Sequence, residues 1–128
     1  MTDTEKITIN MSVVDLGQVD LLVEQGFYSS RSDLIRTAIR NQLSRHADVV
    51  KETVVRKEIV VGVLVYSRAD LERKQAAGDK LDIRVVGMAH IARDVPPELA
   101  REVIQSLHVY GVLRASPAVQ DALADRIK

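Results

Sequence analysis

The chain has 128 residues, 46% of them hydrophobic and 28% charged, which fits one domain or two small ones and excludes a disordered tail. Eighteen basic residues balance eighteen acidic ones, so the whole molecule has no net attraction to nucleic acid or to an anionic membrane. Any such binding must come from a local surface. The absence of cysteine excludes disulfides, thiolate catalysis and cysteine zinc sites.

No apolar run reaches the roughly 18 residues that a membrane span needs. The first six residues also lack the charged and apolar regions of a signal peptide. We therefore expect a cytoplasmic protein that has no membrane partner.

The first predicted element is a strand over residues 6–11, where polar and apolar side chains alternate. A period of two residues places three apolar side chains on one face: Ile7, Ile9 and Met11. The opposite face then carries Lys6, Thr8 and Asn10.

Two helices are predicted after this strand. Ser12 is suited to cap the first helix, and Gly26 is suited to end it. Its apolar face consists of Leu16, Val19, Leu22 and Val23. Ser30 and Asp33 have the spacing of a capping box at the start of the second helix. The apolar stripe of that helix consists of Leu34, Ile35, Ala38, Ile39 and Leu43.

The first forty residues therefore form a unit with one strand and two helices. A lone strand has unpaired backbone groups along both edges, and a unit of this size cannot bury enough apolar surface by itself. The simplest partner is the same strand of a second copy, paired antiparallel across a two-fold axis. We expect an obligate homodimer.

The segment Lys6–Met11, followed by the run Gly26–Arg40 with its serine-rich helix start, resembles the ribbon-helix-helix family of DNA-binding regulators, the CopG, Arc and MetJ group. This resemblance covers the N-terminal third of the chain. Two features depart from the family pattern: no proline follows the strand, and Gly17 lies inside the first helix. The resemblance implies that the paired ribbon enters the major groove of double-stranded DNA.

The same resemblance implies two sets of DNA contacts. The contacts to base edges would come from the outward ribbon residues Lys6, Thr8 and Asn10. The contacts to phosphates would come from the start of the second helix, through Ser29, Ser30 and Arg31. The alternatives are a solvated strand face and a serine that only caps its helix. Residues 1–50 carry five basic and seven acidic side chains, so we expect modest affinity and a shallow salt dependence.

The remainder of the chain contains a connection and three repeats. Residues 47–58 have no glycine or proline; we favour a helix, although their β-branched residues also suit a strand. Three apolar segments, 59–64, 84–89 and 108–113, align on glycines at positions 62, 87 and 111. Helical segments follow them at 69–77, 96–105 and 116–126.

These repeats predict three parallel strands with helices between them. The repeat length suits a solenoid-like βα arrangement, but a compact three-stranded α/β domain fits as well. Because three repeats leave open sheet edges, we expect this part to oligomerise. The predicted fold class is α+β / α/β, with a ribbon-helix-helix domain at 1–46, a connecting segment at 47–58 and a βα domain at 59–128.

No motif for catalysis, metal binding or a cofactor is present. The histidines His46, His90 and His108 do not form a ligand pattern, and the last two lie in different columns of the repeat alignment. The leading hypothesis is a homodimeric, sequence-specific transcriptional repressor and not an enzyme. The alternatives are an antitoxin-like protein that binds a partner, and a self-assembling structural protein with weak DNA binding.

Overall fold

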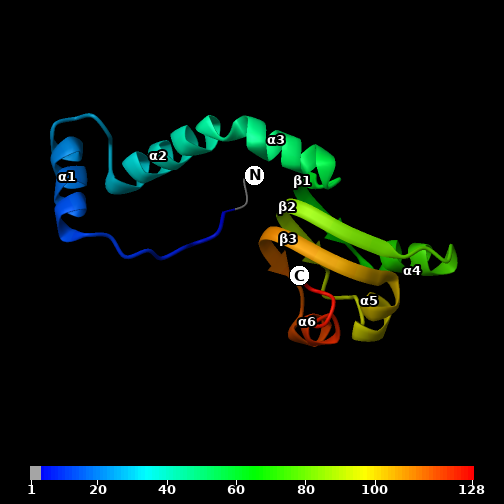
Figure 1. The fold of residues 1–128 in the computed structure, drawn as a ribbon. Helices are drawn as coiled ribbons and strands as arrows, with labels where there is room; N and C mark the ends of the chain where they lie inside the picture. Colours follow the sequence, from blue (N-terminus) through cyan, green and yellow to red (C-terminus); the bar gives the residue numbers. More distant parts are fainter. Residues whose placement is uncertain (1–3) are drawn as a thin grey trace. The chain divides into compact units, whose positions relative to one another are not determined.

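The computed structural model describes residues 4–128, so the expectation for the first six residues lies partly outside the described residues. The chain divides into two compact units, Met1–Thr53 and Val54–Lys128. The helices before the sheet are α1 (Val13–Glu24), α2 (Arg31–Arg45) and α3 (Ala47–Arg56), and they are drawn in blue to green in Figure 1.

The residues that cap α1 are the ones expected from the sequence. The Ser12 hydroxyl accepts a hydrogen bond from the Asp15 backbone N–H at 3.1 Å. At the other end, Gly26 has a φ of 85°, and the Phe27 N–H donates to the Leu22 carbonyl at 3.0 Å. This is a Schellman ending, which needs a left-handed residue and therefore favours glycine.

The strand expected over residues 6–11 is not formed within a single chain. Residues 4–12 belong to neither a helix nor a strand and have no ladder of backbone hydrogen bonds within the chain. A strand needs a neighbour to complete its hydrogen bonds. The pairing of this segment with a second copy therefore stays a prediction.

The described part of the N-terminal unit has no buried residue. Its helices bury none of their side chains, and the predicted apolar faces are at best half-buried. Ile7, Ile9 and Phe27 are 73%, 61% and 71% exposed. Helices this short derive most of their stability from packing an apolar face. The described residues of this unit provide no core against which its helices could pack.

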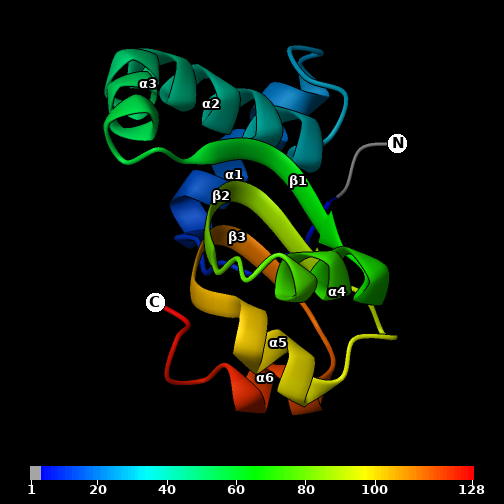
Figure 2. The same ribbon diagram turned by 90° about the vertical axis from the view of Figure 1, so that its right-hand side faces the viewer.

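The C-terminal unit is built on a parallel sheet with strand order β1-β2-β3. Its strands are β1 (Val60–Tyr66), β2 (Leu81–Ile91) and β3 (Ile104–Arg114). The helices that follow them are α4 (Arg68–Ala76), α5 (Pro97–Val103) and α6 (Pro117–Ala122). All three helices pack on one side of the sheet (Figure 2). This confirms a mixed fold with three parallel strands.

The three repeat glycines lie side by side in the sheet, Gly62 beside Gly87 and Gly87 beside Gly111. Their φ angles are 138°, 136° and 128°, values that residues with a side chain rarely adopt. A Cβ on Gly87 would lie 2.0 Å from the Gly62 carbonyl oxygen, and one on Gly111 would lie 2.1 Å from the Gly87 carbonyl oxygen. Only glycine permits this close approach between neighbouring strands.

The core fills the space between the sheet and the three helices. It contains thirteen buried residues: Leu71, Ile83, Val85, Ala89, Ile91, Val95, Leu99, Ala100, Val103, Ile104, Leu107, Val119 and Leu123. Two further buried side chains, Ile59 and Met88, lie outside this cluster. The three helices of this unit therefore cover one face of the sheet.

Two predicted helix ends were wrong. The helix expected over 96–105 stops at Val103, because Ile104 is fully buried and begins β3. The helix expected over 116–126 stops at Ala122, and Ile127 instead pairs with Leu107 in a parallel bridge. The strands extend beyond the predicted apolar segments. In each case packing on the sheet overrides the local periodicity.

Candidate nucleic-acid interface

The predicted base-contacting residues Lys6, Thr8 and Asn10 lie in the segment 4–12 and are all exposed. Two of the apolar residues that alternate with them, Ile7 and Ile9, are exposed too, while Met11 is half-buried. This segment exposes its three polar side chains and two of its three apolar ones, so it has room for a partner on its apolar side and for a ligand on its polar side.

The start of α2 has the predicted bond between Ser30 and Asp33, but the reciprocal bonds to the Asp33 carboxylate come from Ser29 instead of Ser30. The Ser30 hydroxyl accepts from the Asp33 N–H at 3.1 Å, as expected for a cap. The Asp33 carboxylate accepts from the Ser29 N–H at 2.9 Å and from the Ser29 hydroxyl at 3.1 Å. These two donors hold the pKa of the Asp33 carboxyl below its ordinary value.

Arg31 makes a two-bond ion pair within its own chain. Its Nε and Nη2 donate to Oδ1 and Oδ2 of Asp20, both at 2.7 Å. The pair lowers the pKa of Asp20 and raises the pKa of Arg31. Both side chains are about half exposed, so a phosphate can compete with Asp20 for the guanidinium.

Sequence reasoning missed Asp20 as a partner of the predicted site. The two residues of this pair are eleven positions apart, on α1 and at the first residue of α2. Helical pairs are recognised at spacings of three or four, so no spacing rule connects residues across a turn. The structure thus brings Ser29, Ser30 and Arg31 together but engages each of them with an aspartate of the same chain.

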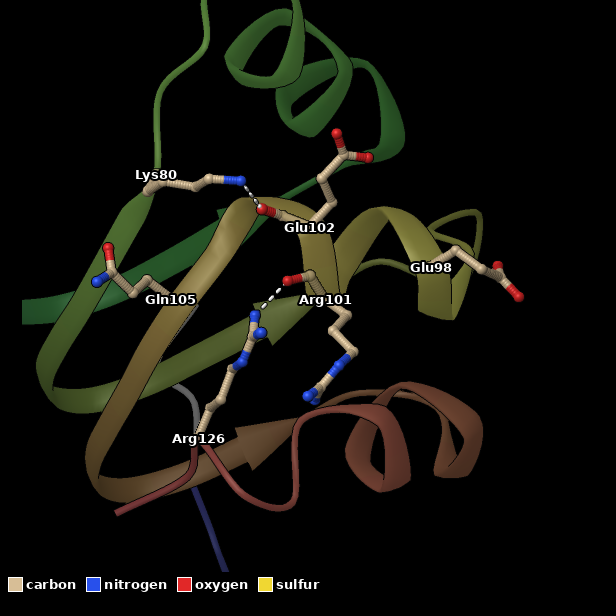
Figure 3. Close-up of a pocket in the computed structure, with 6 residues that line it drawn as sticks. All are labelled: Lys80, Glu98, Arg101, Glu102, Gln105 and Arg126. Carbon is tan, nitrogen blue, oxygen red and sulfur yellow. Dashed lines mark hydrogen bonds between the residues drawn. The ribbon is translucent and has the colours of Figure 1, made fainter.

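The C-terminal unit has a polar hollow of about 650 Å³ that is lined by Lys80, Glu98, Arg101, Glu102, Gln105 and Arg126 (Figure 3). Two of its cations are bound to backbone carbonyls at the end of α5. The Lys80 ammonium donates to the Glu102 carbonyl at 2.6 Å, and the Arg126 guanidinium donates to the carbonyls of Arg101 and Ile104. These contacts satisfy the free carbonyls of a helix end, so the hollow has a structural explanation.

The histidines of the sheet stand in different columns, as predicted. In the strand register His90 lies beside Arg114, whereas His108 lies beside Arg84. The ring of His108 stacks on Tyr110 with centroids 4.4 Å apart. Within residues 4–128, no three histidine, aspartate or glutamate side chains gather as a metal site. No helix in that range is long and apolar enough to cross a bilayer.

Comparison with known proteins gives one family. The sequence model of the Ribbon-Helix-Helix transcriptional regulator family matches residues 2–120. The resemblance predicted for the N-terminal third was therefore too narrow, because the match extends through the sheet. No curated protein and no solved structure matches the chain.

Proposed function

The chain belongs to the ribbon-helix-helix transcriptional regulator family, and we propose that it is a homodimeric repressor that reads a specific DNA sequence through paired segments 6–11. One observation carries the proposal. The N-terminal unit has no buried residue within its described part and exposes large apolar side chains on its first segment and both helices. A second copy supplies the missing core.

The side-chain pattern restricts the two segments to registers that keep each set of side chains on one face, and we propose the register centred on Thr8 because it opposes all three outward residues. Residues directly opposed in an antiparallel ladder share a face. The outward set Lys6, Thr8 and Asn10 then opposes the same set in reverse order, with Thr8 facing Thr8 of the second copy at the two-fold axis. The apolar set turns inward, where Ile7 and Ile9 lose their exposure against the helices.

The outward face of this ribbon offers three kinds of contact per copy. Lysine donates to guanine O6 and N7, and asparagine bonds to adenine N6 and N7. Threonine reaches either a polar base edge or a thymine methyl. Six side chains around a two-fold axis favour a palindromic operator.

The start of α2 anchors the ribbon on the phosphates. Its amides and its positive dipole end suit an anion, and Arg31 adds a charge once the phosphate displaces Asp20. Because this exchange forms one ion pair and breaks another, it contributes little net affinity. Repression follows from occupation of promoter DNA by the dimer.

The proposal is tested by selecting bound sequences from a random duplex library with the full-length protein. The wild type is expected to enrich a palindrome. The variant with Lys6→Ala, Thr8→Ala and Asn10→Ala should lose that enrichment, since each lost bidentate contact removes about 1–3 kcal/mol of discrimination.

A matched control separates loss of reading from loss of folding. Changing Lys51, Glu52 and Lys57 to alanine alters three exposed polar residues elsewhere. That variant should select the wild-type palindrome. If the ribbon variant also selects it with undiminished enrichment, the ribbon does not read DNA.

A further inference from the structure

The outer edge of β1 is an unprotected strand edge. Within residues 4–128, β1 pairs only with β2, and its seven residues, VVGVLVY, contain no charge and no proline. Edges of soluble sheets are ordinarily blunted by lysine, proline or a bulge, because an open apolar edge pairs with other chains. This strand has none of those protections.

The register within the sheet shows what this edge lacks. Val60 lies in the same row as Val85, yet Val60 is 48% exposed and Val85 is fully buried. On the other face of the sheet, Val63 is 48% exposed, whereas Met88 beside it is 8% exposed. The side chains of β2 are less exposed because β2 has a neighbouring strand on both sides, whereas β1 has one on one side. A strand added to β1 would bury its valines in the same way.

The glycine row specifies which strand fits. In each inner junction, the space where the glycine lacks a side chain holds the carbonyl oxygen of the preceding glycine. Gly62 has the same backbone conformation, but the corresponding space beside it is open. The carbonyl of Gly111 occupies the equivalent place at the opposite edge, on β3. The two edges of one unit are therefore complementary to each other.

The β3 edge is available over the required length. The C-terminal residues pair with β3 only at Leu107, through the Arg126 carbonyl and the Lys128 N–H. The existing register continues from Val60 to Val85 to Val109, two residues beyond that bridge. An added β1 would begin at Val109 without displacing the C-terminal segment.

We propose that β3 of one copy adds in parallel to the β1 edge of a second copy, with Gly111 beside Gly62, so that the C-terminal units associate head to tail. Each such junction repeats the β1–β2 and β2–β3 junctions already present in the chain. A head-to-tail contact leaves one open edge of each kind, so it builds chains of molecules. This association does not depend on DNA binding.

The orientation of the added strand is tested by cysteine cross-linking. Because the chain has no native cysteine, only the introduced thiols can form a disulfide. Val61 and Tyr110 occupy one row of the sheet and are both exposed. The full-length Val61→Cys and Tyr110→Cys proteins should form a disulfide when mixed, because neighbouring strand positions lie within disulfide reach. Neither protein should cross-link efficiently alone.

The matched control is a mixture of Val61→Cys with Val112→Cys, which is two residues out of register and should cross-link several-fold more slowly. Efficient disulfide formation by Val61→Cys alone would mean that two β1 edges pair symmetrically, which overturns the proposal. An absence of cross-linking in the Val61 and Tyr110 mixture also overturns it.

Growth is tested by sedimentation of the full-length protein over a range of concentrations. The wild type should exceed the mass of a dimer as concentration rises. Val60→Lys places a charge on a side chain that is half exposed in the single chain and would be buried in the assembly. It should lower the association constant about 100-fold or more. Glu98→Lys on the exposed surface of α5 should grow like the wild type. Equal growth of the Val60→Lys and Glu98→Lys proteins would contradict the proposal.

Discussion

The two units of this chain deal with their apolar residues in opposite ways. The C-terminal unit closes a core of thirteen residues between one sheet face and three helices. The N-terminal unit, in the part that the structure describes, buries no side chain although its segment and helices are rich in isoleucine, leucine and valine. The unit that has its own core is thus the second in sequence. The proposed second copy would supply a core for the N-terminal unit, and the proposed function rests on that pairing.

The largest expected effect is a loss of unfolding free energy in the C-terminal unit. Gly87→Ala would place a methyl group 2.0 Å from a backbone oxygen, so we expect a loss of more than about 4 kcal/mol of unfolding free energy. Gly62→Ala has the same backbone strain but open space, and should cost about 1–3 kcal/mol. Urea denaturation followed by circular dichroism measures both. Equal losses would mean that the close approach is unimportant.

The next prediction compares the two units directly. Leu107→Ala removes a fully buried core side chain and should cost about 2–5 kcal/mol at every protein concentration. Ile39→Ala on α2 changes a side chain that is half exposed in the single chain. The urea midpoint of the N-terminal unit should rise with protein concentration in the wild type and in this variant, and be lower in the variant, because the unit is proposed to be stable only as a dimer. Urea denaturation at two concentrations about a hundredfold apart separates the two behaviours.

A smaller effect concerns the ion pair at the start of α2. Asp20→Asn releases the Arg31 guanidinium, so DNA affinity should rise several-fold and the salt dependence should steepen by about 0.9 for each additional phosphate that the protein neutralises. Glu24→Gln removes a negative charge from the same helix without breaking an ion pair that the structure describes. If both variants raise affinity equally, the effect is general charge and not the release of Arg31.

The smallest expected effect is a pH dependence confined to the N-terminal unit. The pKa values of Asp20 and Asp33 are lowered in the folded chain, by Arg31 and by Ser29 respectively. Their contribution is therefore present above the ordinary carboxyl pKa of about 4 and is lost as the pH falls through the lower folded values. Helical circular dichroism below about pH 4 should fall less in Asp33→Asn, which has no carboxyl to protonate. An identical acid profile would show that the Ser29 contacts are not stabilising.

Local and repeated signals made much of the fold predictable. The capping serines Ser12 and Ser30 and the turn at Gly26 act within a few residues, and the structure has all three. The alignment on glycines at positions 62, 87 and 111 identified the strand register because the same strand shape recurs three times.

What sequence reasoning missed depends on contacts between distant residues. The end of α5 is set by Ile104, which is fully buried in the core and so enters the sheet directly after the helix. The partner of Arg31 lies across a turn, and no periodicity connects it to Asp20. The proposed ribbon would need a second chain, so one sequence predicts its side-chain pattern and not its pairing.

The most direct test of the central claim is a disulfide between two copies at the proposed two-fold axis. Because the chain has no cysteine, Thr8→Cys carries a single thiol, and the proposed register places the two Thr8 positions opposite each other, within disulfide reach. The account predicts rapid and complete cross-linking at micromolar concentration in the absence of DNA. Cross-linking no faster than that of Glu98→Cys, whose thiol would lie on the exposed side of α5, would contradict it.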